Sequence, residues 1–174
     1  MVKEDNCPLF LLSERIQMNQ YFTIKPEYYI EHPTLQKILD INHTEKHNFR
    51  IHLCLAVFYQ ENYILIPLRK NLGPAKRPFG IIGHAVPSQN KPYAGLDYRY
   101  MMVIKDAEYL QAEIPRLPHK QLKIMENHYS QIETEALNYI QGYIKTAKKG
   151  RIKRTPLYRE SALINFHKEL GLES

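Results

Sequence analysis

The side chains best suited to chemistry lie close together in residues 67–78, a segment rich in Gly and Pro with the sequence PLRKNLGPAKRP. Its four cations are Arg69, Lys70, Lys76 and Arg77. An arginine can bind a phosphate with two parallel N–H groups, a lysine can act as a point charge or a proton donor, and Asn71 offers both a donor and an acceptor. The P-loop pattern GxxxxGK followed by Ser or Thr is absent. We interpret the segment as a phosphate-binding loop, with a solvated turn as the alternative.

Two histidines are expected near this loop in the folded chain. His47 precedes a strand expected over residues 51–59, and His84 follows one expected over residues 79–82. Because imidazole titrates near neutral pH, either side chain can act as a general base beside the cations. Both are expected in exposed loops, where a structural role is the alternative.

The sequence does not indicate metal-dependent chemistry. His43 and His47 have the i, i+4 spacing of a metalloprotease pair, but Glu45 is misplaced between them and the surroundings do not favour a helix. His52 and Cys54 share one face of a strand and are interpreted as a structural pair. The acidic residues are too scattered along the chain for a two-metal nuclease site. We therefore expect neither a metal nor a cofactor.

The positive charge of the chain is concentrated in residues 145–159, which we call the basic strip. The strip has no acidic residue and seven cations: Lys145, Lys148, Lys149, Arg151, Lys153, Arg154 and Arg159. The whole chain has 24 Lys and Arg against 18 Asp and Glu, so removing these seven leaves 17 against 18. A localised cationic surface predicts binding to a phosphate backbone, because each neutralised phosphate releases condensed counterions. A solvated, mobile basic loop is the alternative.

Length and composition favour one domain over residues 1–174. A chain of about 150 residues can bury roughly 70% of its unfolded surface, and 44% of the residues here are hydrophobic. No apolar run approaches the roughly 20 residues that span a bilayer, and the apolar residues 8–12 are too few for a secretory signal, so a cytoplasmic protein is expected. The two cysteines lack CxxC spacing and indicate no disulfide framework.

The apolar pattern predicts an α+β fold. Strands are expected over residues 21–24, 51–59, 63–68, 79–82 and 98–104, with a turn at Glu61 and Asn62 in the central hairpin. Helices are expected over residues 27–30 and 34–41, from Asp106 to about Ile114, over residues 122–143 as one long amphipathic helix, and over residues 161–170, ending at Gly171. The first half is thus predicted to form a small twisted β-barrel or a curved sheet.

Several segments, in their order along the chain, resemble the ToxN/AbiQ-type toxins. They are YFTI at residues 21–24, YILIPL at residues 63–68, MMVIKDAE at residues 101–108, and KQLKI at residues 120–124 with Asn127. The resemblance covers roughly residues 21–170, and the CptN and TenpN branches are the more similar ones.

This resemblance implies the protein component of a type III toxin–antitoxin system, acting in abortive infection or plasmid maintenance. Such proteins are metal-independent endoribonucleases with a compact MazF/Kid-like β-barrel core surrounded by helices. A repeated RNA pseudoknot inhibits them. The resemblance therefore implies two RNA partners, an antitoxin and a substrate, and a ring-shaped complex of alternating protein and RNA copies.

The resemblance also implies a functional basic residue at Arg50, where the family has a lysine. It implies a catalytic turn directly after residues 63–68. The family has a Thr-Ser pair in that turn, whereas this chain has Arg69, Lys70 and Asn71, so the roles cannot be copied. Further RNA contacts are expected at Lys120, Gln121, Lys123 and Asn127, at Lys76 and Arg77, and at Lys145, Lys148, Lys149, Arg151, Lys153 and Arg154.

A physical mechanism can be assigned to these residues. In cleavage without a metal, the ribose 2′-OH attacks the adjacent 3′-phosphate, so the protein must align the attack, stabilise the phosphorane and move two protons. We assign Arg50 and Arg69 to charge stabilisation, Lys70 to acid or base catalysis, and Asn71 to orientation; the two histidines are substitutes for proton transfer. The competing hypothesis is a non-catalytic RNA-binding module, whose cations need not converge on one phosphate.

Overall fold

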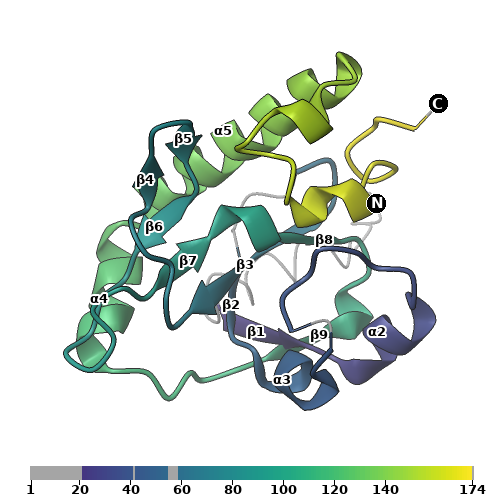
Figure 1. Ribbon diagram of the computed structural model, residues 1–174. Coiled ribbons are helices and arrows are strands. Elements are labelled where there is room, and N and C mark those ends of the chain that lie inside the picture. Colours follow the sequence, from purple (N-terminus) through teal and green to yellow (C-terminus); the bar gives the residue numbers. More distant parts are fainter. Residues whose placement is uncertain (1–20, 41, 55–58, 174) are drawn as a thin grey trace, which may run out of the picture.

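The computed structural model describes residues 21–40, 42–54 and 59–173 (Figure 1). Its strands are β1 (Tyr21–Ile24), β2 (His52–Cys54), β3 (Tyr63–Arg69), β4 (Lys76–Arg77), β5 (Gly80–Ile81), β6 (Gly83–Ala85), β7 (Gly95–Asp97), β8 (Met102–Ile104) and β9 (Leu110–Ala112). Its α-helices are α2 (Pro26–Glu31), α3 (Thr44–Phe49), α4 (His119–Asn127) and α5 (Tyr129–Lys148). Short 3-10 helices cover Tyr98–Tyr100, Ala107–Tyr109, Ile152–Arg154 and Ala162–Asn165. The predicted α+β class is confirmed.

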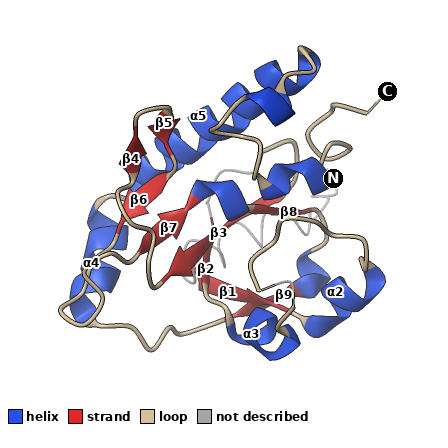
Figure 2. Cartoon of the chain, viewed as in Figure 1, coloured by secondary structure: helices blue, strands red, loops and turns tan. Residues whose placement is uncertain are grey.

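The main sheet is antiparallel and is organised around β3. The strand order is β6-β7-β3-β2-β1-β9. Both β7 and β8 pair with the same edge of β3, β7 at the C-terminal end of the strand and β8 at its N-terminal end. Figure 2 shows α4 and α5 along one flank of this sheet, with α2 and α3 beside β1 and β9. The described strands form an open path and do not close into the expected barrel.

A proline in β3 explains why two strands share this edge. Tyr63, Ile64 and Leu65 pair with β8, and Leu68 and Arg69 pair with β7. The N–H of Leu68 bonds to the Ile51 carbonyl on the β2 side, so the missing N–H of Pro67 faces the opposite side, between β7 and β8. No ladder bond is lost there, because the 3-10 helix Tyr98–Tyr100 separates the two strands.

The predicted hairpin of β2 and β3 is confirmed, but its turn lies one residue earlier than expected. Tyr59 and Asn62 pair across a two-residue turn, in which Gln60 and Glu61 have φ of 48° and 66°. Positive φ at both positions defines a type I′ turn, whose twist matches that of the flanking strands. The Asn62 Nδ2 group donates to the carbonyls of Tyr59 and Gln60 and fixes the turn. The predicted strand residues 55–58 lie outside the described part of the chain.

Two helix predictions in the first half are wrong. Residues 34–40 form no helix, because Lys37 and Asp40 have positive φ of 53° and 56°, which an α-helix cannot contain; residue 41 lies outside the described part. The segment around HTEKH, for which no helix is predicted, forms α3. The predicted first strand and the helix over residues 27–30 are confirmed as β1 and α2.

Predictions around the later strands need three corrections. Residues 79–82 form only the two-residue β5, and of residues 98–104 only the last three form the strand β8. The Asp106 carboxylate accepts a hydrogen bond from the Glu108 N–H at 2.8 Å, but it caps a single 3-10 turn. The chain then continues as β9, which pairs with β1, so the helix expected to Ile114 does not form.

The expected long amphipathic helix is divided at His128, which has φ of −101° and ψ of 11° and separates α4 from α5. The prediction that its apolar stripe is core is confirmed for Ile132, Ala136, Tyr139 and Tyr143, all of them buried. The last helix is reduced to the 3-10 helix Ala162–Asn165 and turns, and Gly171 ends it with a positive φ of 68°. None of the helices in the described ranges is long and apolar enough to cross a membrane.

The strand β2 carries a histidine into the core. His52 is 3% exposed, and its Nδ1 lies 3.0 Å from the Arg50 carbonyl oxygen. Burial, together with the nearby positive charge of Arg50, lowers the pKa of His52 from 6.5 to about 4. The folded protein therefore keeps this side chain neutral at a pH where the unfolded chain protonates it.

We expect the free energy of unfolding to fall as the pH drops from about 6.5 towards 4, because only the unfolded state takes up the His52 proton in that window. A shift of this size contributes roughly 2–3 kcal/mol by pH 4.5. The substitution His52→Gln should remove most of this dependence. Urea denaturation at pH 7 and pH 4.5 measures it, and an equal loss of stability in both proteins would contradict the assignment.

Candidate functional site

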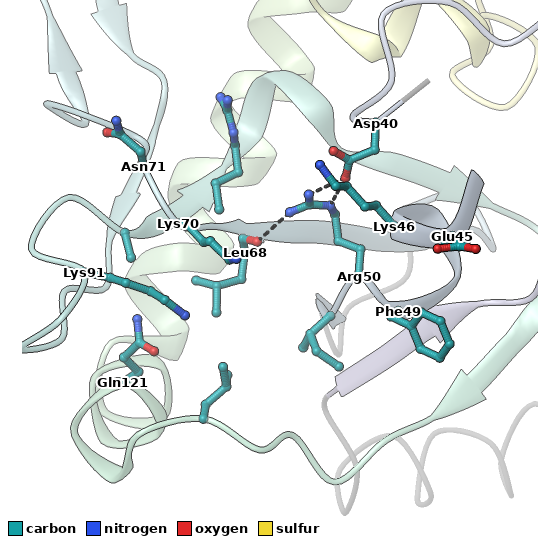
Figure 3. A pocket seen from close by; sticks show the side chains of 14 residues that line it. Asp40, Glu45, Lys46, Phe49, Arg50, Leu68, Lys70, Asn71, Lys91 and Gln121 are labelled. Atoms are coloured by element: carbon teal, nitrogen blue, oxygen red, sulfur yellow. Dashed lines mark hydrogen bonds and ion pairs between the residues drawn. The ribbon is translucent and has the colours of Figure 1, made fainter. Parts of the chain in front are cut away.

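An open groove with a volume of about 680 Å³ lies at the C-terminal end of β3, between α3 and the start of α4 (Figure 3). Its cations come from separate segments of the chain and are Lys46, Arg50, Arg69, Lys70 and Lys91. Its acidic residues are Asp40 and Glu45. This excess of positive charge in a concave surface attracts anionic ligands.

Arg50 forms one wall of the groove and is held by three hydrogen bonds. Its Nε donates to Asp40 Oδ2 at 2.8 Å, its Nη2 donates to the same oxygen, and its Nη1 donates to the Leu68 carbonyl at 3.0 Å. Both charged side chains are mostly buried, with 22% of Arg50 and 16% of Asp40 exposed. The structure thus places Arg50 in the same groove as Arg69 and Lys70, and it pairs the guanidinium with a carboxylate.

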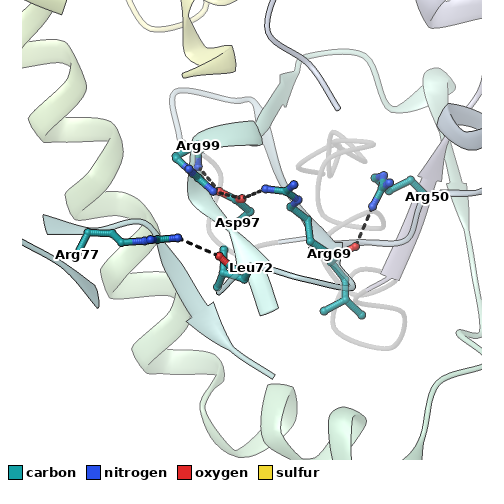
Figure 4. Close-up of polar contacts among 7 residues, drawn as sticks. Arg50, Arg69, Leu72, Arg77, Asp97 and Arg99 are labelled. Carbon is teal, nitrogen blue, oxygen red and sulfur yellow. Dashed lines mark hydrogen bonds and ion pairs between the residues drawn. The ribbon is translucent and has the colours of Figure 1, made fainter. Parts of the chain in front are cut away.

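Arg69 is held by a buried carboxylate that it shares with Arg99 (Figure 4). The Asp97 side chain is fully buried and accepts Arg69 Nη1 at 2.8 Å and Arg99 Nε and Nη2 at 3.0 and 2.8 Å. Both guanidinium carbons also lie near the Tyr100 ring, 5.2 and 5.5 Å from its centroid. Two guanidiniums on one carboxylate leave a net charge of about +1 and hold Arg69 at the groove edge.

Burial lowers the pKa of Arg99, but the hydrogen bonds to Asp97 and its negative charge outweigh this effect and raise the pKa above its usual value. Neither Asp97 nor Arg99 is a predicted site residue. A signal was present in the sequence, since an aspartate beside the buried residues Leu96 and Tyr98 needs a cationic partner. The sequence alone does not say which cation that partner is.

Three lysines of the groove have no ionic partner in the part of the chain that the structure describes. The side chains of Lys46, Lys70 and Lys91 form no hydrogen bond or ion pair with the described residues. Lys70 and Asn71 are exposed, and Figure 3 shows both, with Lys91, on the side of the groove opposite Arg50 and Asp40. These groups can bind an incoming anion without first breaking a contact.

The cationic loop does not act as one unit. Its first part, from Arg69 to Asn71, lines the groove. Lys76 and Arg77 instead form β4, pair with β5 and do not line the groove, and the Arg77 Nη2 donates to the Leu72 carbonyl at 3.3 Å. The loop cations thus lie in two separate places, and phosphate binding by each pair stays a prediction.

The α4 residues divide into one buried contact and an exposed face. Gln121 is 1% exposed, and its Nε2 donates to the Val86 carbonyl at 2.6 Å, so this amide fixes α4 beneath the groove. Lys120, Lys123 and Asn127 are exposed. Their contact with RNA stays a prediction, as does that of the basic strip, which lies at the far end of α5 (Figure 1).

The two candidate histidines lie in different places. His47 belongs to α3, next to the groove residue Lys46, and its side chain lies outside what the structure describes. His84 is buried in β6, not exposed in a loop as predicted, and it does not line the groove. Its Nδ1 lies 3.1 Å from Glu135 Oε2 and its Nε2 lies 3.0 Å from His128 Nδ1. His84 therefore links β6 to the α4–α5 junction.

The carboxylate of Glu135 completes this link. Tyr98 donates its hydroxyl to Glu135 Oε2 at 2.6 Å, and Gln131 donates to Oε1 at 2.7 Å. Burial raises the pKa of Glu135, but these hydrogen bonds and the contact with His84 lower it below its usual value. Within the described ranges, no group of three or more His, Cys, Asp or Glu side chains is placed to hold a metal ion.

The fold and the groove together define an α+β protein with a concave cationic site. No protein-family model, curated protein or solved structure matches the chain.

Proposed function

We propose that this protein is a metal-independent, sequence-selective endoribonuclease toxin of a type III toxin–antitoxin system. The observation that carries the proposal is the groove, in which cations from separate segments surround a volume of about 680 Å³. Ligand sites of this size, on the order of 300–1,000 Å³, hold small organic ligands. A nucleotide with its flanking phosphates fits both the size and the charge.

In the proposed reaction the 2′-oxygen attacks the neighbouring phosphorus while the bond to the 5′-oxygen breaks. A base takes the proton of the 2′-OH and an acid protonates the leaving 5′-oxygen, which gives a 2′,3′-cyclic phosphate and a 5′-hydroxyl. Lys70 is assigned to proton transfer because it is exposed and unpaired with any described residue. Arg69, positioned by Asp97, stabilises the phosphorane with its remaining N–H groups, and Asn71 orients the substrate.

Arg50 has a different role from the one expected of a free cation. Its bonds to Asp40 and to the Leu68 carbonyl fix the groove wall, and they leave little uncompensated charge for the phosphorane. The proposal therefore assigns charge stabilisation first to Arg69. Asp97 and Arg99 act as positioning residues beneath it.

The proposal includes the biological setting that the resemblance implies. The protein would act in the bacterial cytoplasm, with a repeated RNA pseudoknot as antitoxin, in a ring of alternating protein and RNA copies. A MazF/Kid-like core is part of it, supported by the antiparallel sheet around β3 and its covering helices.

A non-catalytic RNA-binding module is the second candidate. The observations that favour it are the division of the cationic loop and the ion pairs that already engage Arg50 and Arg69. Such a module needs only cations that can grip a backbone, spread over the surface.

Expression of the protein alone in bacterial cells tests the proposal against this alternative. We expect growth to stop on induction and cellular transcripts to acquire new 5′-hydroxyl ends at a short common sequence, because the groove would cut accessible RNA. Sequencing of 5′-hydroxyl ends in induced and uninduced cells measures this. Growth arrest with intact transcripts would favour the binding module.

A further inference from the structure

The basic strip is an exposed surface that has no acidic partner among the described residues. All seven of its cations are exposed, and none of them forms an ion pair with a described residue. The sequence has no acidic residue between Glu135 and Glu160. Such a concentration of uncompensated charge is destabilising by self-repulsion, and a bound polyanion relieves it.

The strip is built on ordered turns and not on an irregular loop. Gly150, with φ of 63°, follows the end of α5, and the Arg151 N–H bonds to the Thr146 carbonyl at 3.2 Å. The Thr155 hydroxyl donates to the Arg151 carbonyl at 2.9 Å. Attraction to the helix dipole accounts for the lysines of the last turn, Lys145 and Lys148, but not for the cations beyond the helix.

The β4–β5 hairpin lies beside the strip and adds an aromatic side chain. Gly80 packs against Leu157 of the strip, where a Cβ atom would lie 2.9 Å from a terminal methyl carbon of the leucine, and its φ of 139° favours glycine. The Tyr139 hydroxyl holds the same segment by donating to the Leu157 carbonyl at 3.0 Å. Phe79, at the hairpin turn, is 46% exposed, and Lys76 is exposed on β4. We call the strip and this hairpin together the hairpin–strip surface.

This surface is separate from the groove. The groove is lined by Gln121 of α4, and roughly the first 16 residues of α5, a length of about 24 Å, separate the α4 junction from the start of the strip at Lys145. Figure 1 shows the far end of α5 on the opposite side of the molecule from α3 and α4. One phosphate cannot contact both sites.

We propose that the hairpin–strip surface is a second RNA-binding site, which holds a single-stranded segment through its phosphates and one base stacked on Phe79. Exposed cations beside an exposed aromatic ring match single-stranded nucleic acid, whose bases are free to stack while its backbone follows the charge. The inference rests on the proposed function, in which the bound strand belongs to the RNA antitoxin.

Fluorescence anisotropy with a labelled 15-nucleotide 2′-O-methyl oligouridine, which has no free 2′-OH for the proposed cleavage, tests this proposal at increasing KCl. Replacing Lys148, Lys149, Lys153 and Arg154 by alanine should flatten the plot of log affinity against log salt by about 0.7 per lost phosphate contact. Phe79→Ala should weaken binding by about 10-fold without changing the slope, since stacking contributes roughly 1–3 kcal/mol per base. The double variant Lys105→Ala, Lys168→Ala is the control, because both lysines are exposed and lie outside both sites.

Binding is measured without cleavage, so the result stands even if the protein is not a nuclease. Unchanged affinity and slope in the fourfold variant, with an unchanged melting temperature, would overturn the proposal. Tighter binding of duplex RNA that is insensitive to Phe79→Ala would also overturn it.

Discussion

Replacing Lys70 by alanine is expected to lower the rate of RNA cleavage by about 100-fold or more while the fold stays intact. Proton transfer by a positioned side chain contributes on the order of 10²–10⁴ in rate. Lys70 lines the groove, is exposed and has no partner among the described residues, so its removal leaves no buried group unsatisfied. In cells, the same substitution should abolish growth arrest.

Single-turnover cleavage of a short RNA, together with thermal melting of each protein, measures this effect. Lys105→Ala is the matched control, because it also removes one exposed lysine but lies outside the groove. We expect the control to keep the wild-type rate and both variants to keep the wild-type melting temperature. A Lys70→Ala protein that cuts RNA at full rate would remove Lys70 from the mechanism.

Arg69→Ala is a less selective test of the same site. The fully buried Asp97 would keep only Arg99 as a cationic partner, and breaking a buried ion pair costs about 3–5 kcal/mol when one partner is lost. A loss of activity in that variant would therefore have two causes that the assay does not separate, the lost charge stabilisation and a less stable sheet. Arg69 is partly buried beside Asp97, whereas Lys70 is exposed, so Lys70→Ala is the cleaner variant.

The central strands and the groove residues next to them could be predicted from the sequence. The apolar run that includes β2 and its return as β3 indicate a hairpin, and residues at the end of β3 must lie at that end of the sheet. Arg69, Lys70 and Asn71 are therefore in the groove as expected. The sequence places the hairpin turn one residue too late, because Gln60 and Glu61 are not the Asn or Gly residues usual at positive φ in a type I′ turn.

The other features depend on contacts between distant residues, which a local pattern cannot reveal. The sequence shows four cations in one loop, but the pairing of β4 with β5 moves Lys76 and Arg77 away from the groove. His84 follows a Gly and a short apolar run, yet it is buried against Glu135, 51 positions later. The ion pair of Arg69 with Asp97 likewise joins two strands that only the fold brings together.

Cleavage in excess EDTA is the second expected result, and it should depend completely on one oxygen of the substrate. The groove offers lysines and arginines for proton transfer and charge stabilisation, and in the proposed reaction the nucleophile is the 2′-OH of the RNA itself. A substrate with hydrogen in place of this hydroxyl at the scissile position has no nucleophile. We therefore expect full activity on RNA in EDTA and no cleavage at the deoxy position.

The most direct measurement uses purified protein, free of bound RNA, and two matched oligonucleotides that differ only in the 2′ group at the mapped cleavage site. We expect the all-RNA strand to be cut in EDTA to a 2′,3′-cyclic phosphate and a 5′-hydroxyl, and the deoxy-substituted strand to stay intact at this position. Cleavage of the deoxy-substituted position, activity that appears only with a divalent metal, or no cleavage of any RNA would contradict it.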